Sequence, residues 1–240
     1  NGVSVPKEFF VGENGITEPV DCIFPVIVKP TDGSSALGIS VCHNNTDLKD
    51  ALPKALEYSP SGSAIIEEYV VGTEFTSVYT VVDGEASLVC LRDRFPTLDH
   101  ADATAQFDAS VAPSKYYERY MAEINPNIIK LLRSVHAKCA CVFFQGIANE
   151  NKLVIFECGY RINALLDFYN IDEAIGVNYM EMMIDYALTG KVDVVAGHEG
   201  SHKRYWCIFN ISCHEGKINY DDNTRDILQN SSVIHCQYLQ

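Results

Sequence analysis

Three groups of residues in this chain have the types and spacing that binding of phosphate and metal ions requires. The first is Lys29, which ends an apolar run at residues 24–28 and precedes a loop of small residues at 32–38. Such a loop can bring backbone N–H groups and hydroxyls close to phosphate oxygens, and the lysine adds a point charge. A tight hairpin with an exposed lysine fits the same residues, so this segment alone leaves both interpretations open.

The second group is the acidic stretch EEYVVGTE at residues 67–74, which follows another expected strand. A strand that leaves one part of a protein and enters another makes a hinge, and its backbone groups can pair with the edge of an adenine ring. Glu74 could then accept hydrogen bonds from ribose hydroxyls, because an ionised carboxylate is a pure acceptor. The alternative is a solvated acidic strand end.

The third group lies in an expected hairpin, VFFQGIANENKLVIFECGYRIN. Gln145 and Glu157 fall on its two strands, so both side chains can point from one face of a sheet toward a common point. An amide oxygen and a carboxylate are hard oxygen ligands that suit Mg²⁺. Arg161 could contact a phosphate or a developing anion through two N–H groups. A Glu157–Arg161 salt bridge is the structural alternative.

Two arginines and the cysteines supply further candidates. Arg92 and Arg94 lie at the expected end of a strand, in the first residues of an irregular stretch at 92–112, where they could clamp a carboxylate or a phosphate. Surface charges are the alternative. Cys139 and Cys141 could form a metal pair, although alternate strand residues share a face in any case. The nine cysteines are odd in number, lack a CxxC motif and mostly have apolar neighbours, which predicts reduced thiols in a cytoplasmic protein.

Composition limits the class of protein. A net charge of −14 argues against a nucleic-acid surface, for which a basic footprint is expected. No apolar run approaches the ~18 residues of a membrane-spanning helix, so no membrane association is expected. The chain opens without a methionine, and we therefore expect a fragment that lacks an N-terminal domain of its parent protein.

The elements that must position these residues mix short strands with helices. The expected helices cover 46–58, 114–138 with a break near 125–126, and 171–188. The expected strands are at 24–29, 39–41, 64–66, 75–82, 86–91, 141–147, 153–157, 204–212 and 233–239. Asp83-Gly84 is a strong hairpin turn between two of them. Strands that are joined by hairpins and mixed with helices predict an α+β fold.

The strand–lysine–loop, the E-E-Y-V-x-G-x-E stretch and the hairpin that ends F-E-x-G-Y-R resemble, in this order, the ATP-grasp superfamily. The resemblance covers about residues 3–190. It is nearest to the branch of carbamoyl-phosphate synthase, biotin carboxylase and phosphoribosylglycinamide synthetase. It implies two α+β subdomains that grip a nucleotide between them. The implied division is an entry segment at 1–23, a small lid at 24–71, a large subdomain at 72–194 and a C-terminal extension at 195–240.

The resemblance also implies a role for each matching residue. Lys29 would bind the α- and β-phosphates, and Arg161 would lie near the transferring phosphate, which makes these two the catalytic candidates. Gln145 and Glu157 would be the metal ligands. The remaining nucleotide contacts would come from the lid loop, from the adenine-binding stretch with its Glu68 carbonyl and Val70 N–H, and from a ribose-binding carboxylate: Ser34, Ser35, Gly38, Glu67, Glu68, Tyr69, Val70 and Glu74.

Three departures from the family pattern concern the same site. Gln145 stands where a glutamate is usual, and Gly159 stands where the pattern E-x-N-x-R has its asparagine ligand. Asn163 and Asp167 are the nearby residues that could compensate. A further phosphate-binding lysine usually lies upstream of residue 2, outside this chain.

The function implied is that of an ATP-dependent ligase module that forms an acyl phosphate from a carboxylate, or from bicarbonate, and passes it to an amine. Its cofactors would be ATP and Mg²⁺, with Mn²⁺ as an alternative metal, and its partners would be small-molecule substrates. Arg92, Arg94 and Asn163 would contribute to substrate recognition. A non-catalytic nucleotide-binding sensor or scaffold is the rival hypothesis. A fragment that is inactive without its N-terminal domain is another, and a homodimer is also open.

Overall fold

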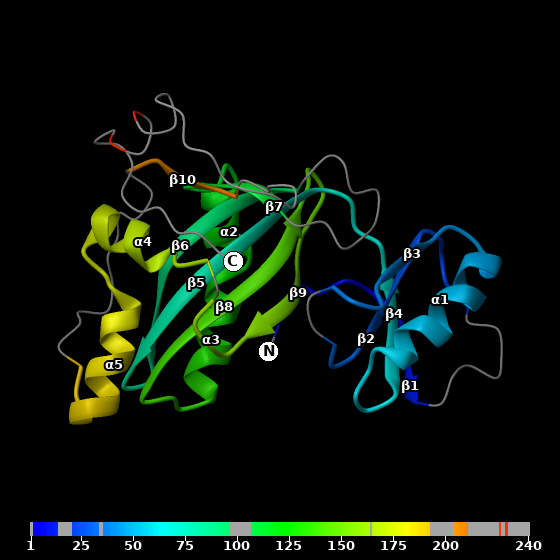
Figure 1. Cartoon of the computed structure of the whole chain (residues 1–240), viewed down its shortest axis with the longest axis horizontal. Helices are drawn as coiled ribbons and strands as arrows, with labels where there is room; N and C mark the ends of the chain where they lie inside the picture. Colours follow the sequence, from blue (N-terminus) through cyan, green and yellow to red (C-terminus); the bar gives the residue numbers. More distant parts are fainter. Residues whose placement is uncertain are drawn as a thin grey trace.

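The computed structural model describes residues 2–13, 21–33, 36–96, 107–163, 165–192 and 204–210, together with residues 226 and 229. Within these ranges the chain forms two antiparallel sheets that lie side by side, each with its own helices (Figure 1). The smaller sheet has four strands and the larger has six. The expected α+β fold class is therefore confirmed.

The four-stranded sheet has the order β1-β4-β2-β3 and carries Lys29. Its strands are β1 (Glu8–Glu13), β2 (Val26–Pro30), β3 (Ser40–Cys42) and β4 (Ser63–Glu68). Alternate residues of β2 are buried against α1 (Asn45–Glu57), as the period of a strand with one covered face requires. The expected helix at 46–58 begins slightly earlier, because Asn44 is the N-cap and its side chain accepts from the backbone N–H groups of Thr46 and Asp47.

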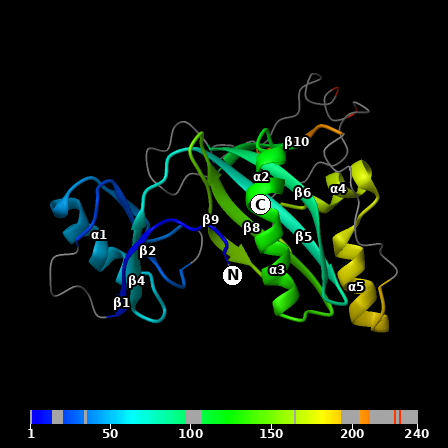
Figure 2. The same ribbon diagram turned by 180° about the vertical axis from the view of Figure 1, so that it is seen from behind.

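The six-stranded sheet has the order β10-β7-β6-β5-β8-β9. Its strands are β5 (Thr73–Val82), β6 (Glu85–Pro96), β7 (Phe107–Ala112), β8 (Cys139–Ala148), β9 (Leu153–Gly159) and β10 (Trp206–Phe209). Helices α2 (Tyr117–Glu123) and α3 (Asn125–Ser134) cover one face (Figure 2). Helices α4 (Phe168–Ile175) and α5 (Tyr179–Thr189) pack on the other face, at the end remote from the small sheet (Figure 1). We call these the α2/α3 face and the α4/α5 face.

Two expectations about the larger sheet were wrong. The stretch 92–112 is not irregular throughout, because β6 continues to Pro96 and pairs with β7, so Arg92 and Arg94 lie within a strand. The expected helix 171–188 is two helices. Gly176 has a left-handed backbone (φ 70°) that ends α4, and the Asn178 side chain caps α5 by accepting from the Glu181 N–H at 3.1 Å. Residues 97–106 and the expected strand at 233–239 lie outside the described residues.

Two chain segments connect the sheets, and the β8–β9 hairpin binds both of them. The Ser4 carbonyl in the first segment accepts from the Ile155 N–H at 2.8 Å. The Val71 carbonyl in the second accepts from Asn149 Nδ2 at 2.8 Å. Gly72 follows directly, and a Cβ at this position would overlap with the Ala148 carbonyl, so this close approach requires glycine. The connection is therefore held against the six-stranded sheet.

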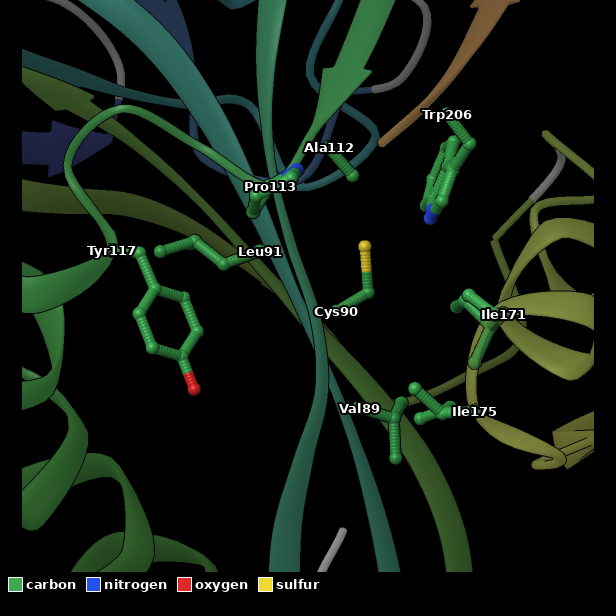
Figure 3. A pocket seen from close by; sticks show the side chains of 10 residues that line it. Val89, Cys90, Leu91, Ala112, Pro113, Tyr117, Ile171, Ile175 and Trp206 are labelled. Carbon is green, nitrogen blue, oxygen red and sulfur yellow. The ribbon is translucent and has the colours of Figure 1, made fainter. Parts of the chain in front are cut away.

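A small apolar pocket lies between β6, β7 and α4, and Cys90, Ala112, Ile171 and Trp206 contribute to its lining (Figure 3). Its interior has room for about one water molecule, so it is a gap in side-chain packing and too small for a substrate. No helix in the described part of the chain is long and apolar enough to cross a membrane.

Candidate functional site

Four polar side chains form one row across the large sheet. Arg92 on β6 lies opposite Thr76 on β5, Thr76 lies opposite Gln145 on β8, and Gln145 lies opposite Glu157 on β9. Directly opposed residues of antiparallel strands project from the same face. The face is the α4/α5 face, since Val78, two residues after Thr76, belongs to the core on that side. We call these residues the polar row.

Two register shifts produce the polar row. In the β5–β6 hairpin the pairing changes between Val78 and Tyr79, which leaves Val89 as an extra residue. In the β8–β9 hairpin it changes between Gln145 and Gly146, which leaves Phe156 as an extra residue. A shift of one residue moves a side chain to the other face. Both shifts are therefore needed to bring Arg92 and Glu157 to the same face as their partners.

Burial increases along the polar row. Glu157 is exposed and Gln145 is half-buried, whereas Thr76 and Arg92 are each 1% exposed. The row therefore has an open end at β9 and a closed end at β6. Electrostatic interactions are stronger at the closed end because less water screens them there.

Lys29 lies near the open end, although it belongs to the small sheet. Its Nζ is 2.5 Å from Glu67 Oε2 and 5.9 Å from the centroid of the Phe156 ring. Phe156 is the residue before Glu157 in β9, so the Lys29 ammonium group lies close to the strand that carries this metal-ligand candidate. Lys29 is half-buried and ion-paired, and it is thus not the exposed lysine of the simple hairpin interpretation, although β2 and β3 do pair as a hairpin.

The loop after Lys29 is only partly described, because Ser34 and Ser35 lie outside the described residues. Gly38 has a φ of 78°, which side chains rarely adopt, and a Cβ there would lie 2.8 Å from Tyr58 Cβ. The close approach and the left-handed backbone both require glycine. This glycine shapes the loop in which the resemblance expects phosphate contacts.

The acidic stretch 67–74 has partners for its carboxylates and is not simply solvated. Lys152, in the turn between β8 and β9, forms an ion pair with Glu68. The hydrogen bond from Lys152 is the main reason why the pKa of Glu68 lies below its usual range. Arg94 Nη1 lies 3.2 Å from Glu74 Oε2. The Tyr69 N–H donates to the Pro25 carbonyl at 3.3 Å, and the Val70 side chain is buried.

Arg161 does not use Glu157 as its partner. Its guanidinium carbon lies 5.0 Å from the centroid of the Phe143 ring, and its Nη1 donates to the Ile162 carbonyl at 3.0 Å. Phe143 also lies opposite Gly159, and a Cβ on Gly159 would overlap with the Phe143 ring. The position that the family pattern gives to asparagine therefore has no room for that side chain beside Phe143.

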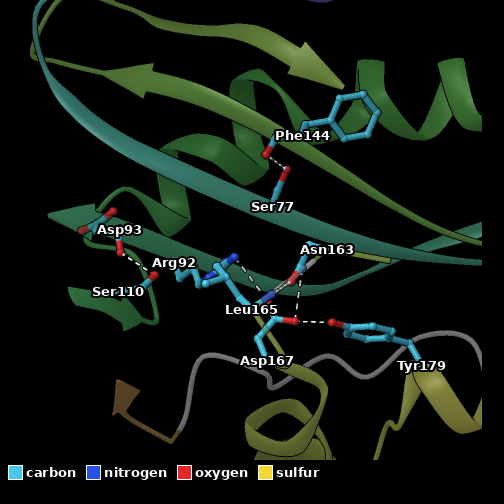
Figure 4. A network of polar contacts seen from close by, with 9 residues as sticks. All are labelled: Ser77, Arg92, Asp93, Ser110, Phe144, Asn163, Leu165, Asp167 and Tyr179. Carbon is cyan, nitrogen blue, oxygen red and sulfur yellow. Dashed lines mark hydrogen bonds and ion pairs between the residues drawn. The ribbon is translucent and has the colours of Figure 1, made fainter. Parts of the chain in front are cut away.

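Asn163 binds Asp167, and Asp167 forms an ion pair with Arg92 (Figure 4). Asn163 Nδ2 donates to both Asp167 carboxylate oxygens at 3.1 Å, and Arg92 Nη2 lies 3.3 Å from Asp167 Oδ2. The Tyr179 hydroxyl donates to Asp167 Oδ1. Burial and the nearby Asp167 carboxylate raise the pKa of Tyr179 well above its usual range. Three donors thus engage the carboxylate of Asp167.

The donor set at the open end fits one hard divalent cation that is shared with an anionic ligand. Gln145 and Glu157 supply one amide oxygen and one carboxylate from directly opposed positions. The described ranges contain no group of three or more His, Cys, Asp or Glu residues that could hold a metal ion without such help. Mg²⁺ commonly keeps several waters and binds through one or two carboxylates plus the phosphates of a substrate.

Sequence reasoning missed Thr76 and Tyr179. Thr76 looks like an ordinary strand residue, and only its pairing with Arg92 and Gln145 places it in the polar row. Tyr179 lies in α5 and reaches the Arg92–Asp167 pair only through tertiary packing. Neither position carries a local sequence signal that would have identified it.

Comparison with known proteins gives a match along more than half of the chain. A family model described as the D-ala D-ala ligase C-terminus matches residues 14–158. A D-alanine--D-alanine ligase of Lactobacillus gasseri is 25% identical over 177 residues, which are 68% of this chain and 48% of that protein. A protein of the same name from a Marinomonas strain is 37% identical over 90 residues, 36% of this chain and 27% of that protein. At its longest matches, the chain spans about half the length of the curated relatives.

Solved structures resemble the chain in fold. The biotin carboxylase domain of the Hydrogenobacter thermophilus 2-oxoglutarate carboxylase, solved with MgADP, ADP and bicarbonate, has a TM-score of 0.68 and 19% identity. This match covers 86% of our chain and 46% of that one. An L-amino acid ligase from Bacillus licheniformis has a TM-score of 0.64 and 16% identity, and the match covers 78% of our chain and 44% of the other.

Proposed function

Because the chain belongs to the D-ala D-ala ligase C-terminus family, we propose that it is the nucleotide-binding part of an ATP-dependent ligase that joins a carboxylate to an amine. The ATP-grasp resemblance is confirmed in family and in fold. Reaction, cofactors and substrates are proposals, since the chain spans about half of its relatives.

One observation carries this proposal: Lys29 of the small sheet lies beside β9 of the large sheet, 5.9 Å from the Phe156 ring, and the next residue of β9 is Glu157, which lies opposite Gln145. A cation on one side and hard oxygen donors on the other are what a nucleotide with its metal needs. We propose residues 24–71 as the lid, joined by β1, which pairs with β4. Residues 72–194 would form the large subdomain, and the extension from 195 is described here only at a few residues.

In the proposed reaction the residues of the chain mainly position and neutralise charge. Lys29 would exchange Glu67 for the α- and β-phosphates, and Arg161 would face the phosphate that is transferred. Gln145 and Glu157 would hold Mg²⁺, which neutralises phosphate charge when it is bound. The stretch 67–70 would hold adenine, and Glu74 the ribose. Phosphoryl transfer to a carboxylate gives an acyl phosphate and ADP, and the amine then displaces phosphate. Most of the rate enhancement would come from orientation and electrostatic stabilisation.

For the substrates we propose amino acids. The support is that the matching family and the curated relatives are named for a ligase that joins two alanines. Bicarbonate, as in the carbamoyl-phosphate synthase branch, has less support, since the likeness to a bicarbonate-bound structure is one of fold at 19% identity. A homodimer and a preceding N-terminal domain stay predictions.

A non-catalytic nucleotide-binding module is the second candidate, and the Phe143–Gly159 contact favours it. A site with one carboxylate at the metal position and no room for the asparagine would hold its cation more weakly. Such a protein would bind MgATP without turnover.

The test measures binding of a fluorescent ADP analogue with Mg²⁺, and then release of ADP and phosphate from ATP in the presence of paired amino acids. We expect binding, and ADP formation that depends on amino acids. Binding without turnover across all D- and L-amino acid pairs would support the second candidate. If wild type and Lys29→Met both fail to bind nucleotide, both candidates are wrong.

A further inference from the structure

The carboxylate of Glu68 links three segments of the chain. Glu68 is the last residue of β4, and its Oε1 pairs with Lys152 Nζ in the turn between β8 and β9. Its Oε2 accepts from the Lys7 N–H at 3.4 Å, and the Glu68 N–H donates to the Lys7 carbonyl at 2.8 Å. Lys7 and Glu68 lie where the two connecting segments meet the small sheet (Figure 2). One side chain therefore links both segments to the β8–β9 hairpin.

The turn that carries Lys152 is itself held in place. The Asn149 side-chain oxygen accepts from two backbone N–H groups of the turn, one of them that of Lys152, at 3.0 Å. Arg119 of α2 donates to the Asn149 carbonyl, and Asn149 Nδ2 donates to the Val71 carbonyl at 2.8 Å. The backbone at Lys152 thus has a defined position against the large sheet, and the ion pair can determine where Glu68 lies.

The neighbouring carboxylate, that of Glu67, has a different partner. Glu67 pairs with Lys29 of the small sheet, and successive residues of a strand project to opposite faces. The end of β4 is thus tied to the proposed lid through Glu67 and to the β8–β9 hairpin through Glu68. Both carboxylate oxygens of Glu68 already have partners, so this side chain is occupied by protein groups and is not a ligand-binding group.

We propose that Glu68 and Lys152 are positioning residues, whose ion pair holds the backbone of residues 68–70 where the edge of an adenine ring can pair with it. This inference rests on the proposed function, in which the stretch 67–70 holds adenine. Neither side chain would touch the nucleotide. The pair would act through the main chain, because a group that is restrained before a ligand arrives loses less conformational entropy when the ligand binds. Without the pair, the stretch would move more readily with the proposed lid.

The test measures the affinity of the whole chain for MgADP by titration with a fluorescent ADP analogue, at a temperature at which circular dichroism shows every variant to be folded. Lys152→Met and Glu68→Gln should each weaken binding about fivefold, since the restraint on the stretch is lost. The double variant should also lose about fivefold, and not about 25-fold, because both substitutions remove the same pair. Lys152→Arg should stay within about twofold of wild type, since it keeps a charged donor for the carboxylate.

The matched control is Lys138→Met. It removes an exposed lysine that also directly precedes a strand of the β8–β9 hairpin, but at the end remote from the turn. It should change the affinity for MgADP less than about twofold, because Lys138 lies far from the stretch. If Lys152→Met does not fold, Glu68→Gln is compared with Glu150→Gln and carries the test.

Three results would overturn the inference and leave the proposed function standing, because wild type binds nucleotide in each of them. Lys152→Met binds MgADP as tightly as wild type, or the losses of the two single variants multiply in the double variant, or Lys152→Arg binds as weakly as Lys152→Met. A wild-type chain that does not bind MgADP refutes the proposed function and this inference together.

Discussion

The ring of Phe143 fills the space that a side chain at position 159 would need, and the Arg161 guanidinium group lies over the same ring, 5.0 Å from its centroid. Phe143 and Gly159 are cross-strand partners at the end of the β8–β9 pairing. The departure from asparagine at 159 is thus coupled to an aromatic residue on the neighbouring strand. One contact explains why both residues are present.

Replacement of Gly159 by asparagine should destabilise the protein. The new side chain must displace a buried ring, and overpacking of this kind destabilises by about 1–3 kcal/mol. Urea unfolding measures the change, with Cys158→Asn at the neighbouring exposed position as control. The double variant Phe143→Leu/Gly159→Asn should recover part of the loss. Equal stabilities of Gly159→Asn and wild type would show that the ring moves away freely.

Lys29→Met should weaken binding of MgADP by about 10- to 100-fold, since a charge-assisted hydrogen bond to phosphate is lost. A fluorescent nucleotide titration measures the affinity. The matched control is Lys49→Met, which removes an exposed lysine from α1, the helix packed on the same sheet, and should leave affinity unchanged. Equal effects of the two substitutions would contradict a specific role for Lys29.

The substitution Gln145→Glu should have opposite effects on thermal stability in the absence and in the presence of metal. A second carboxylate opposite Glu157 introduces repulsion, because like charges that face each other across strands are destabilising. The thermal midpoint without metal should fall by a few degrees. With MgADP it should rise above that of wild type under the same conditions, and Mn²⁺ titration followed by electron paramagnetic resonance should show tighter binding. A fall in midpoint that metal and nucleotide do not reverse would argue against a shared metal site.

Asp167→Asn should be strongly destabilising, by about 3–5 kcal/mol, because it leaves the buried Arg92 charge without its counter-ion. Tyr179→Phe removes one hydrogen bond to the same carboxylate and should cost about 1–3 kcal/mol. Urea unfolding measures both. A pairing of Arg92→Met with Asp167→Leu should be less harmful than Asp167→Asn alone, because neither charge is then buried. If the double variant is less stable than Asp167→Asn, the ion pair is not the main contribution to stability at this site.

The Glu68–Lys152 pair should make stability depend on pH in the acid range. The pKa of Glu68 in the folded protein lies below its ordinary value of about 4.3, so the stabilising contribution is present above that value and is lost as the pH falls through the folded pKa. Glu68→Gln should therefore lower the free energy of unfolding at pH 7 and have a much smaller effect at pH 3. Exposed Glu150 in the neighbouring turn supplies the control, Glu150→Gln. If Glu68→Gln lowered the free energy of unfolding equally at pH 7 and at pH 3, the Glu68–Lys152 pair would not be the cause of the pH dependence.

Sequence patterns predicted the hairpins well and their register poorly. The Asp83-Gly84 turn was correctly placed, but counting outward from it would pair Thr76 with Leu91, because nothing marks Val89 as the extra residue. The extra Phe156 has the same effect in the second hairpin. Bulges depend on tertiary packing as well as on local sequence, and each one reverses the face of every later side chain. The polar row was hidden for this reason.

The wrong expectations for Arg92 and for the helix at 171–188 have different causes. Arg92 was expected at a strand end because its counter-ion, Asp167, lies 75 positions further along the chain, and no local pattern links the two. The apolar periodicity of residues 171–188 continues across the break, which made one helix of two. The break itself could have been predicted, since Gly176 and Asn178 are a typical stop residue and a typical N-cap residue.

The two segments that cross between the sheets have a mechanical consequence. Ser4 and Val71 are both bonded to the β8–β9 hairpin, so the crossings are fixed close together and define one axis of rotation. Displacement about an axis grows with distance from it. Glu68 lies beside the axis, whereas Ala64 at the far end of β4 is four residues away, or about 13 Å. Closure would therefore move the loop after Lys29 through a wide arc and leave the acidic stretch nearly still, so that a nucleotide could dock by its base first and be enclosed at its phosphates afterwards.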